Sequence, residues 1–401
     1  MQERTLRRSL TLPVLTLYGL GNILGAGIYV LIGKVAGHSG ENTILSFLIA
    51  MIIATLTALS YMELSSRYPL SASASIYLHK AFGKRLLSVG VGMILVFGGI
   101  ASASALTKGF AGYLNSIFTV NQTLAGIGMI ILLALVAIKG IGESAKLAAL
   151  FTLVEVFGLL IIIWAGHSHL SAGDFTAAFG IDPAIGLSGV LFGAFLAFYA
   201  FIGFEDMVNV AEEVKKPRTT MPLAILLSLV LATILYILVV MVSLSAVGAS
   251  ELAGSSAPLN LVFDRVSHLS PAYISLIGMA ATINGVLVQL IMGSRILYGL
   301  SSQGWLNKRF SYVHPAYKTP AFSTMLVAGA MILGVLGFGL VSLAEITSLL
   351  ILSAFTLVNA GLAVIKLRKQ TEKVAVKVPL FVPVLGCLSC IGLVIFQLFG
   401  Q

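Results

Sequence analysis

Two short stretches place residues that are unfavourable in a membrane helix in the middle of apolar runs. In NILGAGIYVLIGK, residues 22–34, the triplet Gly25-Ala26-Gly27 lies within an uncharged stretch that extends over 9–33. In FYAFIGFEDMVNVAEEVKKP, residues 198–217, Gly203 is closely followed by Glu205 and Asp206. Glycine costs about 1 kcal/mol relative to alanine inside a helix, and a charge at mid-bilayer costs at least about 2.5 kcal/mol. Both stretches therefore predict a helix that breaks partway along its length.

A helix that breaks inside a bilayer can bind a small zwitterion. The break frees backbone N–H and C=O groups, which must find partners where no water is present. The N–H groups at the positive end of a half-helix suit a carboxylate, and freed carbonyls suit an ammonium group. Glycine permits unusual backbone angles and close approach of a ligand. For the first stretch an alternative stays open, because small residues four apart, such as Gly21 and Gly25, also let membrane helices pack closely.

The two adjacent carboxylates also admit an alternative, namely that their helix ends at the membrane surface. Apolar residues continue after Asp206, however, up to the Glu-Glu-Val-Lys-Lys-Pro terminus. At α-helical spacing, one polar stripe forms on one face. Its members are Glu205, Asn209, Glu212 and Glu213. We interpret this stripe as the wall of a water path toward one membrane surface.

The composition excludes a soluble globular protein. Hydrophobic residues make up 58% of the 401 residues and charged residues 10%, and the mean hydropathy is +1.03. A soluble domain has roughly a quarter of its residues charged. Eleven apolar stretches are long enough to span a bilayer. They lie at about 13–36, 42–66, 86–114, 120–138, 146–166, 186–211, 220–247, 270–302, 319–338, 342–365 and 378–399.

The Lys and Arg residues predict the orientation of these helices. With the N-terminus in the cytoplasm, all of them lie at cytoplasmic ends except Lys34, Lys108, Arg265 and Arg295. So steep a bias predicts a cytoplasmic N-terminus in a multi-pass protein of the plasma membrane. The net charge of +9 is then a topology signal with some attraction to anionic lipid, and no nucleic-acid partner is expected.

The chain is predicted to be one all-α transmembrane domain over 1–401. It divides into two halves of five helices, at about 13–166 and 186–366, followed by an extra helix at 378–399. An odd number of helices per half makes the second half inverted relative to the first. Both predicted breaks fall in the first helix of a half, and such paired interruptions are the best sequence indication of a transporter binding site.

Glu155, in FTLVEVFGLLIII, is the main candidate for carrying a proton. None of the six histidines falls mid-membrane, so a proton relay must use carboxylates. Burial favours the uncharged form of a carboxyl group, and intramembrane ionisable residues are functional by default. The alternative is a Glu155 that is permanently paired or held by an interhelical hydrogen bond, and Arg295 and Lys108 are the intramembrane cations that could pair with it.

Four segments of the sequence resemble one transporter family. GLGNILGAGIYVLIG (19–33) is similar to the first-helix motif of the amino acid–polyamine–organocation superfamily. The segment 198–222 closely resembles the helix 6 signature of its cationic-amino-acid-transporter-like branch, and 293–320 and 340–355 are similar to the helix 8–9 loop and the helix 10 start of that branch. The likeness extends from Tyr18 to about Leu385.

The resemblance implies a LeuT-like fold with a 5+5 inverted repeat, broken helices 1 and 6, and alternating access around a central site. It implies that the substrate carboxylate meets the backbone of Gly25, Ala26 and Gly27. The amino group is then expected near carbonyls of Ile23, Tyr199, Ala200 and Ile202, beside Phe201 and Gly203. Phe201 and Phe204 would gate the site, and Glu205, Asp206 and Asn209 would line the cytoplasmic path.

Two departures from the family pattern concern this site. Ala26 stands where relatives often carry a hydroxyl residue, and Glu155 stands where proton-coupled relatives carry a lysine that replaces a sodium ion. The charge at the second position is therefore reversed. Ser102, Asn284 and Gln289 are further candidates for polar contacts.

The expected function is secondary active transport of an amino acid, by proton symport or by exchange. The alternatives are a polyamine or amine antiporter of the same fold, sodium in place of the proton, and, from other classes, a channel or a membrane sensor. The sequence has no nucleotide-binding motif or metal-ligand cluster, so we expect neither an enzyme nor a metal or organic cofactor. The partners expected are the small-molecule substrate and membrane lipid.

Overall fold

The computed structural model describes residues 10–70, 73–139, 144–170, 180–181, 183, 185–315, 317, 319–368 and 374–399. Within these residues the chain is helical, and one isolated bridge joins Leu10 to Val214. The long helices are α1 (Leu12–Ser39), α2 (Thr43–Arg67), α4 (Arg85–Asn115), α5 (Gln122–Lys139), α6 (Ser144–Gly166), α8 (Gly186–Phe198), α10 (Pro217–Val247), α13 (Ala272–Ser302), α14 (Ala321–Gly337), α15 (Leu340–Leu367) and α16 (Phe381–Phe399). The short helices are α3 (Ser73–Phe82), α9 (Phe204–Met207), α11 (Ala249–Gly254) and α12 (Pro258–Val266).

Each of the eleven predicted spans contains a helix. Among the described residues, nine helical segments are long and apolar enough to cross a membrane, the first of which, Leu12–Arg67, contains both α1 and α2. The shorter apolar helix α14 adds another span. The prediction of an all-α multi-pass membrane protein is confirmed. The short helices α3, α11 and α12 lie between the predicted spans and were not predicted from the sequence.

The ends of the long helices follow from local sequence. Proline occupies the first turn of α1 and of α10, where its missing N–H leaves no helical bond unmade. Gly40 and Gly248 follow these two helices with φ of 54° and 83°. Positive φ at the residue after a helix ends it at little cost when that residue is glycine.

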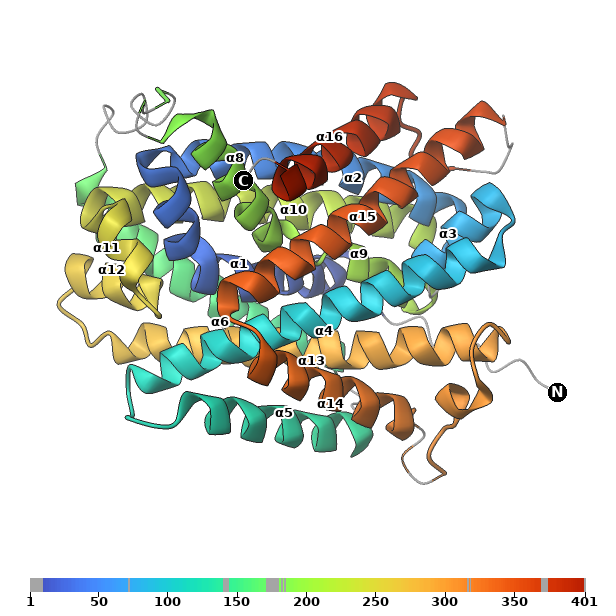
Figure 1. Ribbon diagram of the computed structural model, residues 1–401, viewed down its shortest axis with the longest axis horizontal. Helices are drawn as coiled ribbons and strands as arrows, with labels where there is room; N and C mark the ends of the chain where they lie inside the picture. Colours follow the sequence, from blue (N-terminus) through green and yellow to red (C-terminus); the bar gives the residue numbers. More distant parts are fainter. Residues whose placement is uncertain are drawn as a thin grey trace.

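The centre of the bundle is formed by α1 and the segment that begins with α8. The helix α1 contacts α6, α8, α10 and α13 along its length, and its residues are largely buried. In Figure 1 the helices α5 and α14 lie together at one edge of the bundle, and α15 and α16 lie at another. Large apolar side chains of outer helices, such as Leu132, Trp164 and Leu388, are exposed, as expected for a lipid-facing surface.

The two ends of the bundle differ in charge. Figure 1 shows α3 at one end and α11 and α12 at the other. The first, which we call the basic end, holds Arg67, Lys80 and Arg85, and the cations near the ends of α13 and α15. The opposite end holds Lys34, Lys108 and Arg265. This distribution of Lys and Arg agrees with helices that alternate in direction across the membrane, as predicted.

A buried ionic cluster joins three segments at the basic end. One oxygen of Glu63 accepts hydrogen bonds from Arg67 Nε and Nη2 at 3.0 and 2.6 Å. Its other oxygen lies 2.6 Å from Lys366 Nζ and accepts the Val378 N–H at 2.8 Å. Glu63 is completely buried. The cluster therefore connects α2, α15 and the segment that leads into α16.

The two predicted helix breaks have different outcomes. The break in the second half is confirmed, because α8 ends at Phe198 and a new helix, α9, begins at Phe204. The break in the first helix is wrong, because α1 is helical from Leu12 to Ser39 without interruption. The free-energy cost of a glycine in a helix is small, and the absence of a side chain at Gly27 allows a close contact. An added Cβ at Gly27 would lie 2.0 Å from Ala200 Cα, so the packing alternative describes this stretch.

Candidate functional site

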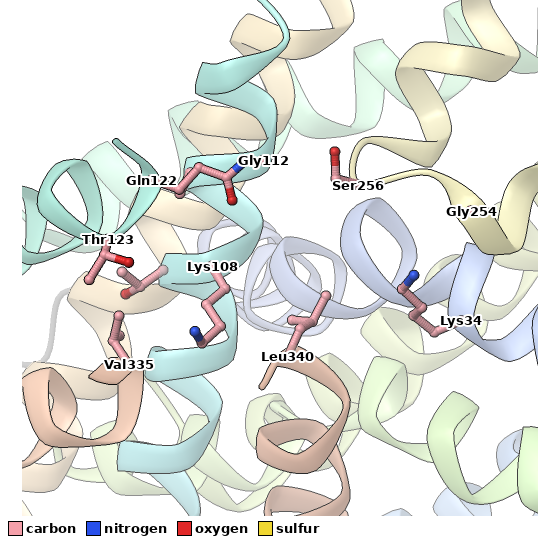
Figure 2. Close-up of a pocket in the computed structure, with 11 residues that line it drawn as sticks. Lys34, Lys108, Gly112, Gln122, Thr123, Gly254, Ser256, Val335 and Leu340 are labelled. Atoms are coloured by element: carbon pink, nitrogen blue, oxygen red, sulfur yellow. The ribbon is translucent and has the colours of Figure 1, made fainter. Parts of the chain in front are cut away.

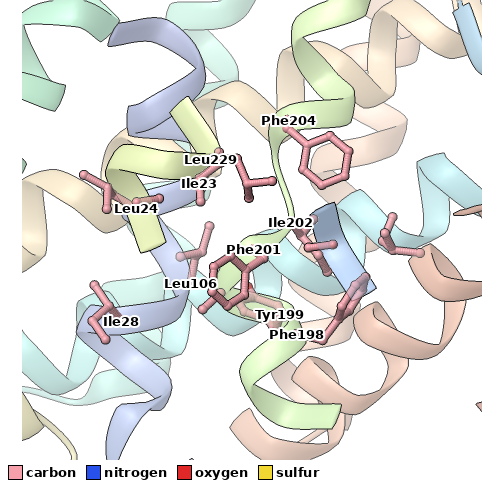
Figure 3. Packing of buried hydrophobic residues seen from close by; sticks show 14 of the residues in the cluster. Ile23, Leu24, Ile28, Leu106, Phe198, Tyr199, Phe201, Ile202, Phe204 and Leu229 are labelled. Atoms are coloured by element: carbon pink, nitrogen blue, oxygen red, sulfur yellow. The ribbon is translucent and has the colours of Figure 1, made fainter. Parts of the chain in front are cut away.

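The chain between α8 and α9 passes through three successive conformations at residues 199–203. A 3-10 turn, η3, covers Tyr199–Phe201, and Ile202 is extended with φ of −68° and ψ of 140°. Gly203 has φ of 131°, a value that residues with a Cβ rarely adopt. Figure 3 shows the extended link, with Phe201 and Phe204 on either side of it. Only a glycine fits at this position. A residue with a Cβ would be strained at this φ, and its Cβ would lie 2.6 Å from the carbonyl oxygen of Asn22 on α1.

The polar backbone groups of Gly203 are paired with side chains. Asn22 Nδ2, on α1, donates to the Gly203 carbonyl at 2.9 Å and to Asp206 Oδ2 at 3.0 Å. The Gly203 N–H donates to Glu205 Oε2 at 2.8 Å. Buried backbone groups outside a helix must be satisfied in this way. The middle of α1 is thereby tied to the break, although sequence reasoning did not single out Asn22.

Asp206 connects three elements. Its Oδ2 accepts from Asn22 and also from Gln289 Nε2 of α13, at 3.0 Å. Asp206 and Glu205 are 8% and 4% exposed, so neither extends into open solvent. The prediction that Glu205 begins a water-facing stripe is not met at this residue, because Glu205 folds back onto the Gly203 N–H. The rest of the segment, Val208–Glu213, winds as a 3-10 helix, in which residues four apart no longer align.

Of the remaining residues of the predicted stripe, only Asn209 has a described side chain. Asn209 is partly buried. The side chains of Glu212 and Glu213 lie outside the described residues, as does that of Ala26.

Two carbonyl groups that were predicted to receive an amino group lie close together. The hydroxyl of Tyr236, on α10, lies 2.7 Å from the Ile23 carbonyl oxygen and 2.8 Å from that of Ala200. A hydroxyl has a single proton to donate, so the two oxygens together offer more acceptor capacity than Tyr236 uses. Tyr236 was missed because one tyrosine in the apolar run LATILYILVV carries no distinguishing pattern.

The three further polar candidates all contact predicted site residues. The Ser102 hydroxyl lies 3.0 Å from the Tyr199 hydroxyl, which also donates to the Ser102 carbonyl at 3.1 Å. Gln289 donates to Asp206, as described above, and Asn284 Nδ2 donates to Glu155 Oε1 at 3.3 Å. A polar side chain in an apolar helix usually has a buried polar partner, and each partner here lies on another helix.

Glu155 lies between α1 and α13 and is completely buried. Its Oε1 has the Asn284 amide as donor, while its Oε2 has no hydrogen-bond partner among the described residues. The Tyr29 hydroxyl donates to the Glu155 carbonyl at 2.7 Å, and the Tyr113 hydroxyl donates to the Tyr29 carbonyl. Neither Arg295 nor Lys108 forms an ion pair with Glu155 within the described part of the chain. The bond from Asn284 on α13 to Glu155 on α6 is an interhelical hydrogen bond, so that alternative for Glu155 stays open.

Aromatic side chains enclose the break on both sides. Phe201 packs edge-on against Tyr236, with ring centroids 5.3 Å apart, and against Phe47. Phe204 packs against Phe355 at 5.2 Å and against Tyr61 at 5.8 Å. Both phenylalanines are completely buried.

The glycines of the first motif lie beside this region. Gly27 contacts Ala200 of η3, and an added Cβ at Gly25 would lie 3.1 Å from the Ala281 carbonyl oxygen of α13. The motif therefore contacts both the broken segment and α13. Its backbone, however, is helical here.

Comparison with known proteins places this architecture in one family. The model of the amino acid permease family matches residues 10–401. The methylthioribose transporter of Bacillus subtilis (strain 168) is 29% identical over 97% of this chain and 87% of its own length. The branched-chain amino acid permease BcaP of the same organism is 28% identical, over 98% of this chain and 89% of its own.

Eukaryotic relatives are matched over a smaller share of their length. Cationic amino acid transporter 4 of Homo sapiens is 30% identical over 92% of this chain and 61% of its own length. The vacuolar cationic amino acid transporter 4 of Arabidopsis thaliana is 31% identical over 90% of this chain and 64% of its own length. The chain thus belongs to the amino acid permease family of the amino acid–polyamine–organocation superfamily, in its cationic-amino-acid-transporter-like branch, and its family indicates a transporter rather than an enzyme.

Proposed function

We propose that this protein is a secondary active amino acid transporter that works by alternating access. The observation that carries the proposal is the break at Ile202 and Gly203, which lies against the middle of α1 with the carbonyls of Ile23 and Ala200 facing one hydroxyl. A broken helix deep in a bundle is where transporters of this architecture bind their substrates.

The proposed substrate site has two parts. The ammonium group binds the carbonyls of Ile23, Tyr199, Ala200 and Ile202, beside Phe201 and Gly203. The carboxylate binds the backbone N–H groups of Gly25, Ala26 and Gly27. In a continuous helix those N–H groups are engaged in i to i−4 bonds, so we infer that α1 opens at the two glycines when substrate binds. Glycine is the residue that adopts the required backbone angles most readily.

We further propose that the two predicted halves, at about 13–166 and 186–366, are inverted repeats within one domain. Equivalent helices would be α1 and α8, α2 and α10, α4 and α13, α5 and α14, and α6 and α15. Two matching pairs of contacts support this equivalence. The helix α1 packs on α10 as α8 packs on α2, and α4 packs on α15 as α13 packs on α6. Movement of one half against the other would expose the site to each side in turn.

The orientation proposed for the chain puts the basic end in the cytoplasm of a cell whose plasma membrane it crosses. The segregation of Lys and Arg supports it. Phe204, Glu205, Asp206 and Asn209, which follow the break toward that end, would then line or close the inward path.

Glu155 is the proposed proton carrier. Its Oε2 has no partner among the described residues, and an ionised carboxylate with one amide donor would be poorly compensated at this depth. We expect Glu155→Gln to abolish uptake of amino acid against its concentration gradient, while exchange of internal for external amino acid continues. The measurement is radiolabelled uptake into proteoliposomes with and without an inward proton gradient. Glu251→Gln, at an exposed carboxylate, is the matched control and is expected to behave as wild type.

The substrate class is tested with a panel of labelled compounds in the same proteoliposomes. We expect uptake of at least one amino acid, displaced by other amino acids and not by putrescine. Uptake of putrescine alone would favour the amine antiporter and remove the carboxylate role of Gly25-Ala26-Gly27. Methylthioribose belongs in the panel because a relative is named for it, and uptake of that compound alone would contradict the amino acid assignment. Sodium is added in a separate arm, and dependence on it would replace the proton as coupling ion.

A further inference from the structure

A cavity of about 250 Å³ lies at the end of the bundle opposite the basic end. Its walls come from the ends of α1, α4 and α5, the start of α15, and the link between α11 and α12. The polar groups that line it include Lys34, Lys108, Gln122, Thr123 and Ser256. Figure 2 shows the two lysines on either side of Leu340. This cavity is separate from the central site, with which it shares no lining residue.

Neither lysine of the cavity forms an ion pair with a carboxylate of the described residues. Lys34 Nζ donates to the Ala253 carbonyl oxygen at 2.8 Å, which provides a hydrogen bond but no opposite charge. Lys108 has no hydrogen bond or ion pair with the described residues. Both lysines are partly buried. A partly buried ammonium group without a counter-charge is costly, and a bound anion would remove that cost.

The surroundings of the cavity add to its positive potential. Gln122 and Thr123 form the first turn of α5, a helix of 18 residues, and the N–H groups of a first turn favour an anion. Two acidic residues near this end are engaged elsewhere. Glu251 pairs with Arg265 at 3.0 Å, and Glu41 lies near the Ala249 N–H at 3.4 Å. A concave site lined by one sign of charge concentrates ions of the opposite sign.

We propose that this cavity is a binding site for a small organic carboxylate. Lys108 supplies the charge that has no other partner, Lys34 supplies a second charge, and the hydroxyl and amide groups of Thr123, Gln122 and Ser256 supply hydrogen bonds. The volume is slightly below the roughly 300–1,000 Å³ of pockets for drug-sized ligands, and it therefore suits a molecule of amino-acid size. If the proposed function is correct, on which this last step rests, the site receives the carboxylate of an amino acid before it reaches the centre.

The test is binding of labelled succinate to the purified full-length protein. Succinate has two carboxylates and no ammonium group, so it lacks the group that the central site requires. We expect saturable binding to the wild type, weakened about tenfold by Lys108→Gln, in keeping with the loss of one charge contact. Lys34→Gln should weaken it as well, and Lys108→Arg, which keeps the charge, should retain it. The control is Lys80→Gln, at an exposed lysine of the basic end.

Three outcomes would overturn the proposal. They are no saturable binding of succinate to the wild type, unchanged affinity in both Lys108→Gln and Lys34→Gln, and displacement of succinate by an equal concentration of chloride, which would indicate an inorganic anion site. Amino acid uptake is measured on the same preparations. Succinate binding without amino acid uptake would leave this site in place and contradict the proposed function, and uptake without succinate binding would do the reverse.

Discussion

Replacing Glu63 by glutamine is expected to lower the free energy of unfolding by about 3–5 kcal/mol, the cost of removing one partner from a buried ion pair. Glu63 is completely buried and its two oxygens receive donors from Arg67, Lys366 and the Val378 N–H. A glutamine offers one acceptor oxygen and turns an NH₂ group toward a cation. Two buried positive charges then face each other without a counter-ion.

Thermal and denaturant unfolding of the purified protein measure this effect. The control is Glu251→Gln, which breaks the Glu251–Arg265 pair at the other end of the bundle. The side chains of that pair are 50% and 46% exposed for Arg265 and Glu251, and exposed pairs contribute about 0.2–1 kcal/mol. Equal losses in the two variants would mean that the Glu63 cluster contributes no more than a surface pair.

Replacing Gly203 by alanine is expected to abolish transport and to destabilise the fold by about 2–6 kcal/mol, the sum of backbone strain and overpacking. The φ of 131° strains any residue with a Cβ. In addition, that Cβ would lie 2.6 Å from the Asn22 carbonyl oxygen. To relieve the contact, the break must move away from α1, which separates Asn22 Nδ2 from the Gly203 carbonyl and from Asp206.

The matched control separates the two causes. Gly304 has φ of 70°, and nothing lies within 4 Å of an added Cβ, so Gly304→Ala introduces strain without a clash. We expect Gly304→Ala to retain uptake at a modest cost in melting temperature. If Gly203→Ala takes up amino acid as Gly304→Ala does, the close contact between the break and α1 has no role in transport.

The sequence predicted the break in the second half because its signal is large. Two adjacent carboxylates in an apolar run cannot face lipid, so the helix that carries Glu205 and Asp206 had to interrupt or turn inward. The glycines of α1 gave a weaker signal. Their propensity cost of about 1 kcal/mol each is small relative to packing, and the contact between Gly27 and Ala200 depends on a residue 173 positions away in the chain.

Polar residues in apolar helices were identified from the sequence, but their partners were not. Ser102, Asn284 and Gln289 were candidates for polar contacts with the substrate, and a buried polar group in a membrane helix also needs a partner. The structure pairs them with Tyr199, Glu155 and Asp206, and each pair joins two helices whose relative rotation no local pattern specifies. For the same reason the contacts of Glu63 with Lys366 and Val378 were not predictable from the sequence.

The most direct test of the account is whether protons enter with the amino acid. Proteoliposomes are loaded with a pH-sensitive dye, and the amino acid identified in the uptake panel is added without sodium and without a pH gradient. The account predicts that the lumen of wild-type vesicles becomes acidic as labelled amino acid enters. It predicts no acidification with Glu155→Gln, while exchange of labelled amino acid persists. Entry of amino acid at constant internal pH, equal in the wild type and in Glu155→Gln, would contradict it.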